Sequence, residues 1–198
     1  MSLKKEAAER IAAERKEQIL NAAITLFDEK GYGNTTISEI AQKAGISKGL
    51  VYNYYNSKLD ILKATEKIIA ECETLIKSQS SVYDALYKNA SRLIYNADVT
   101  DYYSPIRVLL SSAVKGEISA EDFEDMPCGN IFKPHLGAEI LSEVIRKGQE
   151  TGEIRSGDPV ELADFIWTYT IGLIIQIRYC HNPLNLEEAI RKLCELLK

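Results

Sequence analysis

Two short helices joined by a tight turn are predicted by residues 35–58, TTISEIAQKAGISKGLVYNYYNSK. Thr36 and Glu39 have the spacing of a capping box, which starts a helix at residue 37, and Gly45 ends that helix. Ser47 caps a second helix that runs from residue 48 to about residue 54. Only three residues separate the helices, which is the spacing of a helix-turn-helix and also of an ordinary helical hairpin.

The side chains that follow the turn favour DNA as a partner. Cationic and hydroxyl donors, which phosphate groups require, are concentrated in Lys48, Tyr52, Asn53, Tyr54 and Lys58. Val51 and Tyr55 are four residues apart, so we expect both to face the core. Gly49 is a poor helix former, and its presence fits a close approach of the backbone to DNA.

Hydrophobic periodicity on both sides of this segment predicts helices only, so we expect an all-α fold. A first amphipathic helix carries Ile19, Ala23 and Leu26 on one face and ends at Gly31. Ser57 precedes a long fourth helix. The later helices are expected over residues 82–97, 105–114, about 134–150, 159–180 and 186–197, with one short helix between residues 115 and 135.

The charge is distributed unevenly along the chain. The net charge of −5 argues against a nucleic-acid partner, but residues 1–63 carry ten Lys and Arg against eight Asp and Glu. The remainder carries fourteen against twenty-one. This asymmetry suits a small DNA-binding head on an acidic body. We therefore expect a helix-turn-helix domain over residues 1–60 and a larger helical domain over residues 61–198.

Cysteine usage and hydropathy indicate a cytoplasmic protein. The four cysteines, at positions 72, 128, 180 and 194, are far apart in sequence and suggest neither a zinc ribbon nor a disulfide framework. No secretory signal precedes the charged N-terminal stretch. The longest apolar run, residues 165–177, contains polar residues and is too short to span a bilayer, so we expect a buried helix and no membrane partner.

A family resemblance is carried by residues 19–62, ILNAAITLFDEKGYGNTTISEIAQKAGISKGLVYNYYNSKLDIL. Its marks are an alanine-rich first helix ending in Phe27 and Gly31, a threonine pair opening the second helix, and the run through Gly45 to the aromatic pair and Lys58. This stretch, about a fifth of the chain, resembles the DNA-binding domain of TetR-family transcription regulators. The resemblance implies a three-helix domain whose third helix enters the major groove.

The resemblance also implies roles for single residues. Phosphate contacts are expected from Thr35 or Thr36 and from Tyr52, Tyr54 and Lys58, and base contacts from Lys48, Gly49 and Asn53. Ser47 and Leu50 complete the expected DNA-binding set. At position 50 the family often has alanine or a small hydroxylated residue, so Leu50 either contacts a thymine methyl group or packs internally.

The C-terminal part should provide the dimer and the ligand site. The segment from Gly148, GQETGEIRSGDPVELADFIWTYTIGLI, resembles the approach to the penultimate helix that, in the family, pairs with the last helix to form the dimer. We expect a homodimer through residues 159–180 and 186–197, with an apolar stripe on the last helix buried in the interface. That stripe consists of Leu186, Ile190, Leu193 and Leu197.

A small-molecule site requires apolar walls with a few polar tips. Residues that can supply them are Tyr87, Arg107, Trp167, Tyr169 and Gln176. No cofactor, metal site or catalytic residue is expected, because His135 and His181 lack partners at ligand spacing and no nucleotide-binding loop occurs. The chain is therefore not predicted to be an enzyme.

The sequence predicts a dimeric transcription regulator that binds double-stranded operator DNA and is released from it by a small-molecule effector. The alternative is a cytosolic helical interaction protein whose head domain binds a protein partner. Salt dependence distinguishes the two, because affinity for DNA falls steeply with salt. An enzyme with a helical body ranks last, since no residue pair suits acid–base chemistry.

Overall fold

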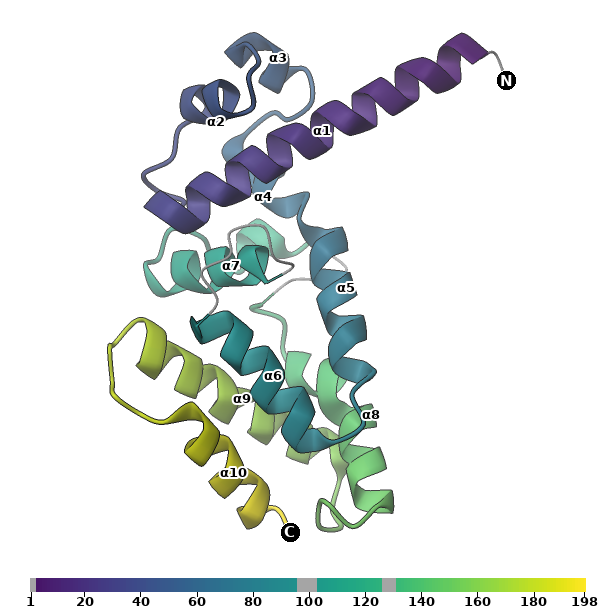
Figure 1. The fold of residues 1–198 in the computed structure, drawn as a ribbon, viewed down its shortest axis with the longest axis vertical. Coiled ribbons are helices and arrows are strands. Elements are labelled where there is room, and N and C mark those ends of the chain that lie inside the picture. The colour runs from purple at the N-terminus through teal and green to yellow at the C-terminus, as the bar shows by residue number, and fades with distance from the viewer. Residues whose placement is uncertain (1–2, 96–102, 126–130) are drawn as a thin grey trace. The chain divides into compact units, whose positions relative to one another are not determined.

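The computed structural model describes residues 3–95, 103–125 and 131–198, and every regular element among them is helical. The all-α prediction is therefore confirmed. Cys128 lies outside the described residues. In chain order the elements, labelled in Figure 1, are α1 (Leu3–Lys30), α2 (Ile37–Lys43), α3 (Lys48–Tyr52), α4 (Lys58–Lys63), α5 (Glu66–Lys77), α6 (Val82–Tyr95), α7 (Ser104–Val114), the short 3₁₀ helix η1 (Glu121–Phe123), α8 (Leu136–Glu150), α9 (Pro159–Arg178) and α10 (Leu186–Leu196).

Two compact units divide the described residues, one containing 3–69 with 103–125 and the other 70–95 with 131–198. In the first unit, α1 packs against α2, α4 and α7, and α2 packs against α3. Its core is built from side chains that are almost wholly buried, among them Ile19, Phe27, Ile40, Val51 and Leu62. The second half of α1 is thus the support on which the short helices rest.

In the second unit, α8 and α9 lie side by side along much of their length. Gly137 allows this approach, because a Cβ atom there would lie 2.4 Å from the Cβ of Trp167. Asp164 of α9 accepts a hydrogen bond from the Ala138 amide at 2.8 Å and so caps the N-terminus of α8. Glu153 does the same for α6, accepting from the amides of Val82 and Tyr83.

Helix boundaries differ from the predictions in two places. α1 begins at Leu3, well before the predicted amphipathic helix, because this alanine-rich segment has high helix propensity and carries i, i+4 pairs such as Lys5–Glu9. The prediction of one long fourth helix after Ser57 was wrong, because the chain forms two helices there, α4 and α5. The break lies at Thr65, whose buried hydroxyl and amide both donate to the Leu62 carbonyl.

The compact units also divide the chain differently from the expected boundary at residue 60. Residues 103–125 pack with the N-terminal helices, and a buried ion pair joins α7 to α1. Arg107 is 1% exposed, and its guanidinium donates to the Asp28 carboxylate at 2.9 Å and to the Ser104 hydroxyl at 2.6 Å. The sequence could not reveal this pair, because its members are 79 residues apart.

The predicted role of the α10 stripe was wrong. Leu186, Ile190, Leu193 and Leu197 are all at most 4% exposed within the single chain, where α10 packs on α6 and α9. The exposed apolar surface lies on α9 instead. This helix is long and apolar enough to cross a membrane by length and composition, yet only 33% of its apolar window is buried within the chain.

We expect Arg107→Ala to lower the free energy of unfolding by about 3–5 kcal/mol, because the largely buried Asp28 carboxylate would lose its ion pair with Arg107. Urea unfolding measures the change. The matched control is Arg191→Ala, which removes an exposed pair with Glu195 and should cost less than about 1 kcal/mol. Equal losses in the two variants would contradict a special role for the buried pair.

Candidate nucleic-acid interface

The helix-turn-helix is formed by α2, α3 and the turn between them. Thr36 and Glu39 make the predicted capping box, with the Glu39 carboxylate accepting from both the amide and the hydroxyl of Thr36 at 2.9 Å. Gly45 has φ +65°, a left-handed conformation that favours glycine, and the Ser47 hydroxyl caps α3 by accepting from the Leu50 amide. The motif predicted from spacing is therefore present as a folded unit.

Burial divides α3 into two faces. Val51 is fully buried and Tyr55, just beyond the helix, is 9% exposed, as predicted. The opposite surface presents Lys48, Gly49, Tyr52 and Asn53, all exposed, and Tyr52 retains 47% of its accessible surface. Nothing lies within 4 Å of a Cβ atom built on Gly49, so this part of the backbone is open to a partner.

The remaining predicted positions border this surface. Leu50 and Tyr54 are half-buried, whereas Thr36 and Ser47 are exposed but already act as caps. Leu50 therefore packs partly against the protein and still has surface that a ligand could reach. All of these residues belong to the same compact unit.

Two predicted phosphate-binding residues are engaged within the protein. Thr35 is 2% exposed, and its hydroxyl donates to the carbonyls of Gly31 and Leu26. The Lys58 ammonium donates to the carbonyls of Tyr32 (2.5 Å), Thr35 (3.0 Å) and Gly33 (3.4 Å). The same ammonium lies 4.3 Å from the centre of the Tyr32 ring. Both side chains hold the loop between α1 and α2 in shape.

Two pKa shifts reflect this local network. A hydrogen bond from Lys30 and those from Thr36 lower the pKa of Glu39 to about 2, so its carboxylate remains charged and keeps capping α2 well below neutral pH. Burial lowers the pKa of Lys58, and the nearby Glu117 carboxylate opposes that shift. Lys30 and Lys58 are therefore engaged with groups of the protein, whereas Lys48 remains exposed.

Sequence reasoning missed one contact that positions the motif. The Gln18 side-chain amide donates to the carbonyl of Ala44, the C-cap residue of α2, at 2.6 Å. The Arg15 guanidinium in turn donates to the Gln18 side chain at 2.6 Å. These residues join α1 to the turn, and only a three-dimensional arrangement could reveal it.

The five predicted ligand-binding residues are divided between the two compact units. Arg107 belongs to the first compact unit and pairs with Asp28, whereas the other four lie in the second unit. Tyr87 stacks on Tyr83 with ring centres 5.5 Å apart. Tyr169 and Gln176 are exposed on α9. Of the five, Trp167 lines a hollow of about 350 Å³ beside the N-terminus of α8.

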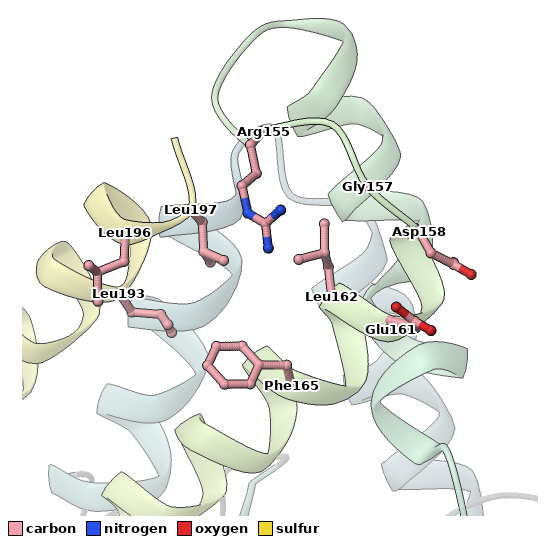
Figure 2. Close-up of a pocket in the computed structure, with 9 residues that line it drawn as sticks. All are labelled: Arg155, Gly157, Asp158, Glu161, Leu162, Phe165, Leu193, Leu196 and Leu197. Atoms are coloured by element: carbon pink, nitrogen blue, oxygen red, sulfur yellow. The ribbon is translucent and has the colours of Figure 1, made fainter.

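A second hollow, of about 420 Å³, lies between the start of α9 and the end of α10. Figure 2 shows the Arg155 side chain extending between Leu197 and Leu162, with Phe165 and Leu193 across the hollow from it. None of the predicted ligand-binding residues lines it. In the described part of the chain, no three His, Cys, Asp or Glu side chains are grouped closely enough to hold a metal ion.

Residues 19–65 match the family model described as bacterial regulatory proteins, tetR family. The HTH-type transcriptional regulator HbdR of Aromatoleum sp. is 45% identical over 62 residues, covering 31% of this chain and 27% of HbdR. The negative transcriptional regulator IcaR of the biofilm operon icaADBC in Staphylococcus epidermidis is 34% identical over 105 residues, covering 50% and 54%. The chain therefore spans about a quarter to a half of the length of these curated relatives.

A likeness in fold extends over nearly the whole chain. The transcriptional regulator FadR from Bacillus subtilis, solved in complex with stearoyl-CoA, superposes with a TM-score of 0.54 at 22% identity, covering 91% of this chain and 96% of FadR. At this identity the likeness establishes the fold. The match to the family model covers residues 19–65.

Proposed function

Because residues 19–65 form a domain of the tetR family of bacterial regulatory proteins, we propose that the chain is a dimeric, ligand-responsive transcription regulator that binds operator DNA through α3. The observation that carries the proposal is the exposed surface of α3. Lys48, Tyr52 and Asn53 present one cation, one phenol and one amide there, beside an open glycine backbone. This mixture suits the phosphates and base edges of a major groove.

The contacts divide into two classes. Tyr52 and Tyr54 bind phosphates, whereas Lys48, Gly49 and Asn53 lie along the base edges. Thr35, Thr36 and Lys58 have no direct part, because their donors are used on carbonyls or on the Glu39 carboxylate within the unit. Ser47 caps α3 and so fixes where the helix begins. Leu50 adds a half-buried apolar side chain beside the base-contacting residues.

Repression is the mode of regulation that we propose, since IcaR is named a negative regulator. An effector bound in the second compact unit shifts the dimer towards a form whose two α3 helices no longer fit successive grooves. The hollow beside Trp167 is the proposed effector site. The competing interpretation, a head that binds protein, is not favoured because the named relatives are transcription regulators.

The exposed face of α9 is the proposed dimer interface. Phe165, Tyr169, Gly172 and Gln176 follow one another at helical spacing, and Phe165 is 57% exposed. Apolar surface of this kind is stabilised when a second copy covers it, and a twofold axis would bring the same face of both protomers together. Gly172 has open space around its Cβ position, which permits close helix contact.

Lys48→Ala should reduce discrimination between operator and scrambled duplex by about 1–3 kcal/mol, because a base contact is lost. Tyr52→Ala should weaken both duplexes about equally, because a phosphate contact carries no sequence information. Fluorescence titrations of both duplexes at several salt concentrations measure the effects. Lys88→Ala, which removes an exposed cation from α6, is the control. Wild-type affinity in both α3 variants would exclude α3 as the reading helix.

The double variant Phe165→Glu/Tyr169→Glu should weaken dimerisation by roughly 100-fold, because it replaces buried apolar contacts with like charges. Sedimentation should show the 22.2 kDa monomer in place of a species of twice that mass. The control Tyr95→Glu alters an aromatic residue that is 60% exposed on α6 and should remain dimeric. A double variant that stays dimeric would locate the interface elsewhere.

An effector at 100 times its Kd should stabilise the folded protein by about 2.7 kcal/mol and also weaken operator binding. A thermal-shift screen of small organic molecules that includes stearoyl-CoA would identify such compounds, and operator titration at saturation measures the coupling. Trp167→Ala should abolish the thermal shift. A compound that stabilises the protein but leaves operator affinity unchanged would disprove the proposed coupling.

A further inference from the structure

The first half of α1 is a helical extension whose side chains are almost all exposed in its own compact unit. Residues 5–18 are all exposed except Ala12, which is half-buried, and the first buried residue is Ile19. The family match also begins at residue 19. Local ion pairs, Lys5–Glu9 and Arg10–Glu14, support the helix along this length. The extension therefore lies outside the part of the head that its fold requires.

The helical repeat gives the extension two different faces. The buried stripe of α1 contains Ile19, Ala23 and Leu26, and continuing it towards the N-terminus at 3.6 residues per turn reaches Arg15, Ala12, Ala8 and Lys5. Lys16 and Glu9 lie at the edge of the same side, and Glu9 pairs with Lys5. The opposite side carries Glu6, Arg10, Glu14 and Glu17. Cations with alanines between them thus share the side of α1 that faces the helix-turn-helix.

Two contacts join this basic side to the helix-turn-helix. The Arg15 guanidinium donates a hydrogen bond to the side-chain oxygen of Gln18, and the Gln18 amide donates one to the carbonyl of Ala44 at the end of α2. The Tyr55 hydroxyl, just beyond α3, donates to the backbone carbonyl of Lys16 at 3.3 Å. Within this unit, α1 runs past α2 and α3 and its N-terminal half projects beyond them (Figure 1). These contacts fix the start of the extension against the helix-turn-helix, so the basic side has a defined position relative to α3.

We infer that residues 5–16 of α1 form a second DNA contact, which binds the phosphate backbone outside the base pairs that α3 reads. The side has three cations against the one carboxylate of Glu9, and its other side chains are small alanines, so it offers net positive charge to a polyanion and lets the helix approach closely. It has no continuous stripe of large apolar residues, which a protein partner or a membrane surface would require. The inference rests on the proposed function of α3.

Matched arginines on one helix provide the test. Arg15→Gln and Arg10→Gln remove the same charge from opposite sides of α1. Operator affinity would be titrated from 50 to about 300 mM salt, because each lost phosphate contact lowers the slope of log K against log salt by about 0.9. Because a bound dimer would lose one contact from each protomer, we expect Arg15→Gln to weaken binding about 3–10-fold and to reduce the steepness of the slope by about 1.8. Arg10→Gln should leave both unchanged.

A second measurement uses the length of the duplex. Trimming base pairs outside the α3 footprint should weaken binding of the wild-type chain, but not of Lys5→Gln/Arg15→Gln/Lys16→Gln, which no longer has the cations to hold the flanks. Circular dichroism and sedimentation check that the triple variant keeps its helix content and assembly. Glutamine has a helix propensity close to that of lysine and arginine, so α1 should persist.

The outcomes separate this inference from the proposed function. Equal effects of Arg15→Gln and Arg10→Gln, or the same dependence on duplex length in the wild-type and triple variant, would overturn the inference. A changed sedimentation coefficient in the triple variant with unchanged DNA affinity would also overturn it, in favour of self-association. If the wild-type chain showed no salt-dependent DNA binding at all, the proposed function itself would fail.

Discussion

The surface offered by α3 depends on a five-residue helix that cannot be stable by itself, since short helices are marginal in water. Its geometry is imposed by three constraints, namely the Ser47 cap, the left-handed turn at Gly45 and the burial of Val51. Val51 is buried in the core of its unit, where α3 packs against α2 and α2 packs against α1. The orientation of Lys48 and Tyr52 is consequently a property of the whole unit and not of their local sequence.

Charged and hydroxyl side chains in this unit perform two different tasks. Lys58, Thr35 and Arg107 use their donors on carbonyls or on a buried carboxylate, so they fix the positions of loops and helices. Lys48 and the basic side of α1 remain exposed. A buried donor without a partner costs more than an exposed one, so the engaged residues are those whose replacement should affect stability most.

A similar division applies to apolar residues in the second unit. The apolar stripe of α10 is buried within the single chain, because α6 and α9 cover it. Apolar surface that the chain does not cover lies on α9. Phe165 and Tyr169 are exposed there, and the helix as a whole is strongly apolar. Periodicity identifies an apolar stripe but does not say whether the same chain or a second copy covers it.

The sequence by itself determined the all-α class, the capping box at Thr36, the turn at Gly45 and the inward positions of Val51 and Tyr55. These features depend on residues close together in the chain, so spacing and residue type suffice to predict them. Only the tertiary structure decided that Arg107 pairs with Asp28, that the donors of Thr35 and Lys58 are used on backbone carbonyls, and that the predicted ligand residues belong to two compact units. These outcomes depend on which groups, distant in sequence, lie close enough in the fold to pair with a buried donor. Spacing along the chain does not identify those groups.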